Sequence, residues 1–383
     1  MIQALGLTTE QQQLQTTVRS FLDSYCTKEW IDRVEHEKAF PEDLYQRMAE
    51  LGLFGIGVPA EYGGFGGGHL EVGLIAEQLG HFGGSVVFTW FPTAVFGTQT
   101  ILSAGDDAMK QRMLPGMVDG KLRTAFALTE PEAGSDAASV RTQARYDDGQ
   151  WVIDGTKVWS SGALAADYLV LTARTGEAGA SKALTLFLVD ARTAGITIRA
   201  IPKLGHHAVA SCEINLQGVR IGADSVIGEV GDAWTGLSQA LNTERLGVGA
   251  VCTGMSQHCT DLALAYGLDR RQFGQPIAGF QAISHMLADM ETETAAARLL
   301  TRSAAWRADT GLPFSKEASM AKAYATECAT RSATRGMQIF GGYGYSTEYE
   351  IERFYREAKL YEVAGGTTQI QRNIIARHLG IPI

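Results

Sequence analysis

The hydrophobic pattern of the chain changes twice, and this change constrains the fold more than any other feature of the sequence. From about Arg123 to about Ile227, short runs such as RTAFAL, YLVLTAR and LTLFLVD follow one another. Turn signals such as Asp147-Asp148-Gly149 and Asp154-Gly155 separate these runs. Short strands at this spacing predict an antiparallel barrel-like or sandwich domain rather than βαβ units.

Helical periodicity precedes and follows this β region. Residues from about 8 to 120 and from Ala233 onward carry amphipathic patterns of helix length, and Thr8, Thr9 and Glu10 form an N-cap signal for the first helix. A chain of 383 residues is also too long for one simple core. We therefore predict a mostly α protein with a central β-domain. Its predicted parts are an N-terminal helical domain (1–122), a middle β-domain (123–227) and a C-terminal helical domain (228–383).

The composition indicates a globular protein and excludes several classes of partner. Hydrophobic residues make up 45% of the chain and charged residues 20%, which is typical of folded domains. The net charge of −9 argues against nucleic acid as the main partner, because phosphate backbones require a basic surface. The five cysteines are scattered without a CxxC pair, and neither a signal-peptide pattern nor a run of 18 apolar residues occurs. We expect a cytoplasmic protein with no membrane insertion and no metal site.

Two segments of the β region carry side chains that suit a planar, phosphorylated ligand. FALTEPEAGSDAASVRT (Phe126–Thr142) contains Thr129 and Ser135, whose hydroxyls and neighbouring amides can bind a ring edge or a pyrophosphate. GTKVWSSGA (Gly155–Ala163) sets Trp159 beside two serines, and its indole can stack on a planar cofactor. Taken singly, the first segment reads equally well as a polar turn, and a lone tryptophan more often belongs to a core.

Two further segments lie in the C-terminal helical region. LDRRQFGQPIAGFQAISHMLADM (Leu268–Met290) contains Arg270 and Arg271, which can hold phosphate through forked hydrogen bonds. MQIFGGYGYSTEYEIERFYREAK (Met337–Lys359) breaks a helix at Gly341-Gly342, where a backbone can approach a ligand closely. A solvated charged face and a helix-to-helix turn would give similar patterns.

In order and spacing, these segments resemble the signatures of the acyl-CoA dehydrogenase family of flavoproteins. The resemblance rests on VPAEYGG, ALTEPEAGSD, DGTKVWSSGA, RRQFGQPIAGFQAISHMLADM and MQIFGGYGYSTEYEIERFYREAKLYEVAGGTTQIQR, and it covers nearly the whole chain. It implies an N-terminal helical domain, an antiparallel β-barrel-like middle domain and a C-terminal four-helix bundle. It also implies FAD as cofactor, a homotetramer or homodimer, and an electron-transfer flavoprotein as electron acceptor for the oxidation of an acyl-CoA.

The resemblance assigns most of the residues singled out above to the FAD site. In the middle domain, the positions that would line the flavin and meet its reactive edge are Phe126, Leu128, Thr129, Trp159 and Ser161. Ser135 would lie on the pyrophosphate or pantetheine side. The remaining FAD positions are Arg270, Gln272, Phe273, Gln281, Gln338, Gly341, Gly342, Thr367 and Gln369.

The position of the catalytic base departs from the common pattern of the family. The implied reaction is α,β-desaturation of an acyl thioester, in which a carboxylate removes the α-proton and the β-hydrogen leaves as hydride to flavin N5. Many members have a glutamate directly before the Gly-Thr pair, where this chain has Gly365. In the isovaleryl and long-chain branches the base precedes an arginine on the first long helix of the C-terminal bundle, as Glu244 precedes Arg245 here. The resemblance thus implies Glu244 as the base, with the Gly365 N–H bonding the thioester oxygen; read alone, Glu244 could be a surface helix residue.

Other departures bear on the substrate. The loop KLGHHAVASC has His207, Ala208 and Val209 where an arginine and a serine are common beside CoA, which raises the alternative of a carrier-protein thioester. Bulky aromatics in SVVFTWFPTAVF predict a short or branched acyl group, although they could equally face the core. The residues expected to contact substrate are Ser135, Asn242, Arg245, Trp90 and Phe91.

Three alternative functions remain open from the sequence. The first is a dehydrogenase for a thioester on an acyl-carrier protein. The second is a flavin oxidase or monooxygenase on the same fold. The third is a non-catalytic flavin- or acyl-CoA-binding protein, which the glycine at position 365 would suit.

Overall fold

The structure is a computed structural model that describes residues 6–176 and 183–382, and it divides the chain into two compact units. The helical unit comprises Met1–Asp32, Gly68–Val87 and Glu244–Ile383. The sheet unit comprises Arg33–Gly67 and Phe88–Thr243. The predicted division into three consecutive domains is a different partition of the chain and stays a prediction.

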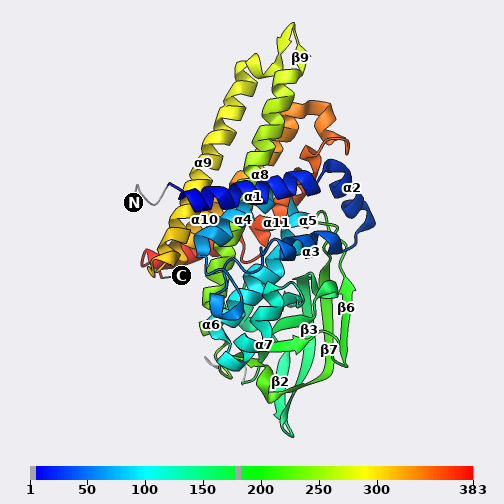
Figure 1. Cartoon of the computed structure of the whole chain (residues 1–383), viewed down its shortest axis with the longest axis vertical. Helices are drawn as coiled ribbons and strands as arrows, with labels where there is room; N and C mark the ends of the chain where they lie inside the picture. Colours follow the sequence, from blue (N-terminus) through cyan, green and yellow to red (C-terminus); the bar gives the residue numbers. More distant parts are fainter. Residues whose placement is uncertain (1–5, 177–182, 383) are drawn as a thin grey trace. The chain divides into compact units, whose positions relative to one another are not determined.

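The helical unit consists mainly of helices, and a short hairpin joins α8 (Ala233–Asp269) to α9 (Gln281–Asp309) (Figure 1). In its core, α10 packs against α9, α11 and α12, and α4 packs against α1 and α9. Its elements are α1 (Thr9–Tyr25), α4 (His69–Phe82), α9 (Gln281–Asp309), α10 (Ser315–Phe340), η8 (Gly341–Tyr345), α11 (Ile351–Val363), α12 (Thr368–His378), β9 (Arg271–Gln272), β10 (Gln275–Pro276), η7 (Ile277–Gly279) and most of α8 (Ala233–Asp269). The predicted C-terminal helical region is confirmed, and the finer four-helix arrangement stays a prediction.

The first helix begins where the sequence predicted. Thr8 is the N-cap of α1, and its hydroxyl oxygen accepts a hydrogen bond from the backbone N–H of Gln11 at 3.3 Å. The Gln11 side chain in turn accepts from the Thr8 N–H at 3.0 Å. This reciprocal capping box satisfies two N–H groups that the first turn leaves unpaired.

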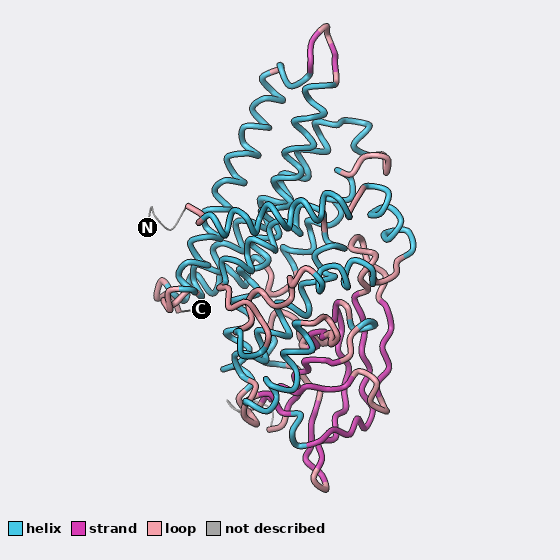
Figure 2. Tube along the Cα trace, viewed as in Figure 1, coloured by secondary structure: helices cyan, strands magenta, loops and turns pink. Residues whose placement is uncertain are grey.

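The sheet unit surrounds an eight-stranded sheet, which Figure 2 shows in magenta. Its strands are β1 (Thr124–Ala127), β2 (Gln143–Asp147), β3 (Gln150–Ser161), β4 (Tyr168–Arg174), β5 (Leu184–Asp190), β6 (Ile196–Ala200), β7 (Ser211–Gly222) and β8 (Val226–Ile227). Its helical elements are α3 (Glu42–Glu50), η2 (Ala60–Tyr62), the π-helical turn η3 (Pro92–Gly97), α6 (Thr98–Ala104), α7 (Asp107–Val118), η4 (Ala137–Ser139), η5 (Ala163–Ala165) and η6 (Ala223–Ser225). The unit boundary passes through α2 (Lys28–Glu37), α5 (Gly84–Phe91) and α8.

The prediction of an antiparallel, barrel-like sheet is wrong in two respects. The strands follow the open order β6-β7-β3-β2-β4-β5-β8, and the edge strands β6 and β8 do not pair with each other. The sheet is also mixed, because β1 runs parallel to β4 and β2 meets β4 in a parallel pair. Strand pairing between distant segments is not encoded in the period-two pattern of a single strand, so the sequence identified the strands but not their closure.

Both faces of the central strands are covered, which explains their continuous apolar sequences. In β5, Leu184, Leu186 and Leu188 join a cluster with α7, whereas Phe187 and Val189 join the cluster on the opposite face. Successive side chains of a strand point to opposite faces, so a strand buried on both sides has no polar alternation.

The described helices include none that is long and apolar enough to cross a membrane. Within the same described ranges, no group of His, Cys, Asp and Glu side chains is arranged to hold a metal ion. All five cysteines are free and buried.

Candidate active site

Glu244 and Gly365 lie against each other in the helical unit, although they are 121 residues apart in the sequence. Glu244 lies on α8 and is only 2% exposed. Gly365 lies in the turn that joins α11 to α12. A Cβ atom at position 365 would overlap Oε1 of Glu244 and would lie 2.6 Å from its Cδ. The carboxyl group therefore occupies the space that a side chain at position 365 would need.

The turn requires glycine at two successive positions for a second reason. The φ angles of Gly365 and Gly366 are +57° and +82°, a left-handed conformation that residues with a Cβ adopt at a cost. A Cβ on Gly366 would also approach the Gln371 side chain to 2.9 Å. The double glycine in LYEVAGGTTQ is thus explained by backbone conformation and by the close approach of Glu244.

The environment of Glu244 favours a carboxyl group that takes up and releases a proton. Burial raises the pKa of Glu244, and the charges of Lys322 and then Arg245 oppose that rise. Nζ of Lys322 is 3.8 Å from Oε1. Oε2 of Glu244 has no hydrogen-bond partner among the described residues. A buried carboxylate with one free oxygen is suited to act as a general base.

Glu362 is the other carboxylate near this turn in the sequence, and the structure gives it a different role. Its Oε2 accepts a hydrogen bond from Nζ of Lys359 at 2.7 Å. A carboxylate neutralised by a surface lysine one turn away is a common helix contact. Glu244, rather than Glu362, is the carboxylate that meets Gly365.

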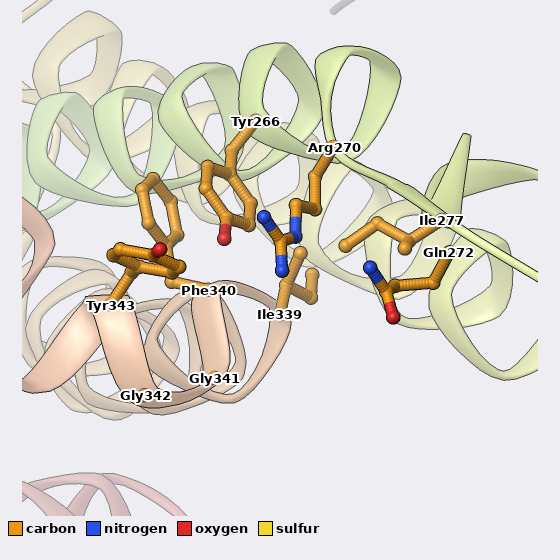
Figure 3. A pocket seen from close by; sticks show the side chains of 9 residues that line it. All are labelled: Tyr266, Arg270, Gln272, Ile277, Ile339, Phe340, Gly341, Gly342 and Tyr343. Carbon is orange, nitrogen blue, oxygen red and sulfur yellow. The ribbon is translucent and has the colours of Figure 1, made fainter.

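A second group of predicted residues lines a hollow of about 530 Å³ in the helical unit (Figure 3). Arg270 and Gln272 lie beside Gly341 and Gly342, and Figure 3 shows the side chain of Arg270, the residue that follows the end of α8, directed into the hollow. The other lining residues are Tyr266, Ile277, Ile339, Phe340 and Tyr343. No described atom lies within 4 Å of a Cβ built on either glycine. A guanidinium group facing open glycine backbone can hold an anionic or phosphorylated group.

The remaining predicted FAD residues of the helical unit lie outside this hollow. Phe273 is 94% exposed at the tip of the β9–β10 hairpin, with a φ of +50°. Gln281 and Gln338 have exposed side chains on α9 and α10. The Thr367 hydroxyl accepts from the Ile370 N–H at 3.3 Å and so caps α12, next to the exposed Gln369.

In the sheet unit, backbone contacts join the two predicted flavin segments. The N–H of Val158 donates to the carbonyl of Thr129 at 2.8 Å. The buried Lys157 donates to the carbonyl of Leu128 at 3.0 Å and to Glu130 at 2.7 Å. The segment of Phe126, Leu128 and Thr129 is therefore fixed against the strand that carries Trp159 and Ser161.

Both side chains of the Lys157–Glu130 ion pair also form hydrogen bonds to the surrounding backbone. Both oxygens of Glu130 accept hydrogen bonds, one from the Thr142 N–H at 2.9 Å and the other from the Arg141 N–H. Burial would raise the pKa of Glu130, but Lys157 and these donors bring it below the usual range. Burial lowers the pKa of Lys157 to about 8, against the pull of Glu130. This pair was missed in the sequence, where it looks like two ordinary surface charges.

Trp159 has a backbone conformation that turns its indole outward. Its φ is +63°, and the pairing of β3 with β7 shifts register between Lys157 and Ser160. The side chain is 57% exposed. A bulky residue with positive φ is uncommon, and such strain concentrates at binding sites. Ser161 is held nearby, with its Oγ 3.1 Å from Oγ of Ser211.

The predicted substrate residues of the sheet unit differ in their surroundings. Trp90 is 1% exposed, and its indole N–H donates to the Leu53 carbonyl at 3.0 Å. Phe91 is also buried and meets Phe96 edge to face, with ring centroids 5.7 Å apart. Both aromatics are packed into the interior of the unit. Ser135 is exposed and Asn242 is half-buried.

Comparison with known proteins identifies relatives across the whole chain. Family models described as the N-terminal, middle and C-terminal domains of acyl-CoA dehydrogenase match residues 8–121, 125–219 and 231–380. The probable acyl-CoA dehydrogenase YngJ of Bacillus subtilis (strain 168) is 38% identical over 378 residues, which is 97% of this chain and 98% of that protein.

A second relative and a solved structure agree with this result. The caffeyl-CoA reductase-Etf complex subunit CarC of Acetobacterium woodii is 34% identical over 94% of this chain and 95% of its own. The structure of butyryl-CoA dehydrogenase from Megasphaera elsdenii matches with a TM-score of 0.94 at 32% identity, covering 98% of this chain and 99% of that one.

Substitution of Gly365 tests whether Glu244 fills the space at this position. Gly365→Ala should lower the free energy of unfolding, measured in urea, by about 1–2 kcal/mol for the left-handed backbone. It should cost about 1–3 kcal/mol more for the overlap with Glu244. Gly311→Ala is the matched control, because Gly311 has a φ of +71° and no described atom within 4 Å of a built Cβ. Equal losses in the two variants would contradict the close approach.

Proposed function

Because the chain belongs to the acyl-CoA dehydrogenase family, it is an FAD-dependent oxidoreductase that acts on acyl-CoA, and we propose that Glu244 is the base of an α,β-desaturation. One observation carries this proposal: the carboxyl group of Glu244 occupies the space that a side chain at position 365 would fill. A carboxylate delivered from α8 thus takes the place of one delivered from the α11–α12 turn. Only one of the two positions can hold it.

The proposed base has the properties that removal of an α-proton demands. The α-proton of a thioester is weakly acidic, so the base must have a pKa near the working pH. Burial raises the pKa of Glu244 in that direction, and Oε2 is not engaged by any described residue. The backbone N–H of Gly365 would donate to the thioester oxygen as negative charge develops there. Arg245, next to the base on α8, would bind the substrate or shape its pocket.

Each unit, taken by itself, offers residues that suit FAD, which supplies the hydride acceptor when it is bound. In the sheet unit, Trp159 presents an exposed indole from a strained backbone, with Ser161 two residues on. Phe126, Leu128 and Thr129 lie on the segment that Lys157 fixes. In the helical unit, Arg270 and Gln272 face the open backbone of Gly341 and Gly342. We assign this hollow to a phosphate-bearing part of the cofactor, with Phe273, Gln281, Gln338, Thr367 and Gln369 as further contacts.

The acyl group is proposed to be short or branched. Trp90 and Phe91 are buried, and the Trp90 N–H donates a hydrogen bond to the Leu53 carbonyl. If these aromatic side chains form the end of the acyl pocket, their fixed packing limits the length of chain that the pocket accepts. Ser135 and Asn242 are proposed contacts for the pantetheine part.

We infer the protein partners from one relative and from exposed aromatic side chains. The name of the A. woodii relative places that protein in a complex with an Etf, and we propose an electron-transfer flavoprotein as the acceptor here. Phe273 at 94% exposure and the exposed Tyr345 suit cover by a second copy of the chain, as a homodimer or homotetramer. The cytoplasmic location remains part of the proposal.

Replacement of Glu244 tests the assignment of the base. Glu244→Gln should keep bound FAD but slow anaerobic flavin bleaching by a short acyl-CoA by on the order of 10²–10⁴-fold, because the amide cannot take the proton. The measurement is stopped-flow absorbance of the flavin, with a panel of straight, branched and carrier-protein thioesters. Glu362→Gln is the matched control and should bleach at the rate of the unaltered protein. A Glu244→Gln protein that bleaches as fast as its parent would remove Glu244 from the mechanism.

The pH dependence of bleaching should report the same group. The base must be ionised, so the rate should fall as pH decreases through the pKa of Glu244. Because burial raises that pKa, the midpoint should lie above the ordinary glutamate value of about 4.3. The limiting rate measured at saturating acyl-CoA across the pH range tests this. A profile without an acidic limb would contradict a carboxylate base.

A further inference from the structure

Lys322 is a buried lysine whose three hydrogen-bond donors all serve one turn. It lies on α10 and is 1% exposed. Its Nζ donates to the carbonyl oxygens of Ala364 at 2.6 Å, Gly365 at 2.5 Å and Gly366 at 3.1 Å. An ammonium group has three protons, so its donors match these three acceptors. The three carbonyls belong to the turn that carries Gly365.

This clamp fixes the direction of the N–H groups in the same turn. A trans peptide unit holds its C=O and N–H on opposite sides, and no cis peptide occurs in the described chain. When the carbonyls of Ala364, Gly365 and Gly366 point at Lys322, the N–H groups of the next residues point away from it. Among the hydrogen bonds of the described residues, none uses the N–H of Gly365, Gly366 or Thr367. Successive N–H groups on one side of a turn form a site for a developing negative charge.

Lys322 also supplies the positive charge that faces the proposed base. Its Nζ is 3.8 Å from Oε1 of Glu244, too far for a hydrogen bond but close enough for a strong attraction in a buried site. Lys322 can therefore stabilise Glu244 as an anion without forming a hydrogen bond to it. Oε2 of Glu244 has no hydrogen-bond partner among the described residues, whereas both oxygens of Glu130 accept hydrogen bonds.

The ionisable groups that act on Glu244 and Lys322 come from the helices packed around them. Burial lowers the pKa of Lys322, Glu244 opposes this change, and Arg245 adds to it. From α8, Arg245 and the buried thiol of Cys252 act on the pair. From α11, Glu362 acts on Cys252, and Tyr361 lies near the same thiol. Of these groups, Lys322 is the cation with the larger influence on Glu244.

We propose that Lys322 is the positioning residue of this site: it holds the 364–366 turn so that the Gly365 N–H is free for the thioester oxygen, and it keeps Glu244 anionic. The inference rests on the proposed role of Glu244. The proposed role of Lys322 involves no contact with substrate or cofactor. Lys322 acts through the turn and through its charge.

Gln371 is an uncharged residue that bonds the same turn as Lys322, so comparing the two separates the effect of turn geometry from that of charge. From α12, its buried side-chain amide donates to the carbonyl of Gly366 at 2.9 Å and to that of Gly365 at 3.4 Å. It therefore holds the same turn as Lys322 but carries no charge. A substitution at Gln371 should loosen the turn without changing the electrostatics of Glu244.

The test compares Lys322→Met, Lys322→Arg and Gln371→Met as FAD-loaded proteins. The Glu244 carboxyl is titrated by infrared spectroscopy, with its band assigned by difference against Glu244→Gln. Lys322→Met should move the midpoint upward by about one to three pH units, because an opposing charge is lost. Lys322→Arg and Gln371→Met should leave the midpoint in place. Because arginine cannot reproduce the three-carbonyl clamp, Lys322→Arg should lower the limiting rate of flavin bleaching by on the order of 10²-fold.

Each part of the inference can fail by itself. An unchanged midpoint in Lys322→Met, or an equal shift in Gln371→Met, would overturn the electrostatic role. If Lys322→Met does not fold, a parental bleaching rate in Lys322→Arg would overturn the positioning role. The infrared titration needs no turnover, so it also separates this inference from the proposed function. Full bleaching by Glu244→Gln would refute the base, whereas an unmoved titration with an inactive Glu244→Gln would refute only Lys322.

Discussion

The close approach of Glu244 to Gly365 is the constraint on which the site depends. A side chain at position 365 and a carboxyl group from α8 cannot share that space. The glycine removes the steric obstacle, permits the left-handed turn and leaves a backbone N–H at the same point. In the proposed site, these three properties of Gly365 all depend on the presence of Glu244 on α8. The absence of a side chain at position 365 is thus what gives the Glu244 carboxyl group its room.

Each unit contains a buried lysine that bonds a segment of candidate site residues, but the carboxylate beside the lysine differs between the two units. In the sheet unit, Lys157 bonds the Leu128 carbonyl and Glu130, and every oxygen of that carboxylate is engaged. In the helical unit, Lys322 bonds three carbonyls but stays 3.8 Å from Glu244. The pKa of the first carboxyl is lowered and that of the second is raised. A satisfied carboxylate fixes a loop, whereas a buried carboxylate with a free oxygen can take a proton.

The sequence predicted those features that depend on local pattern. The order of helical and β regions and the Thr8 cap follow from short-range periodicity and side-chain chemistry. The pairing of Glu244 with Gly365 was reached through family resemblance, because no local pattern links α8 with the α11–α12 turn. The closed barrel was wrong because closure depends on which distant strands pair. Lys322 was missed because a lone lysine among alanines resembles a surface residue; its place on the face of Ala318, Ala321 and Ala325 was the available signal.

The most direct measurement of the central claim is exchange of the substrate α-proton with solvent, because it isolates the base from the hydride step. A short acyl-CoA is incubated in D₂O with the FAD-loaded enzyme, and deuterium at the α-carbon is followed by NMR. If Glu244 is the base, the parent and Glu362→Gln should introduce deuterium and Glu244→Gln should not. Deuterium incorporation by Glu244→Gln at the parental rate would show that another group removes the proton.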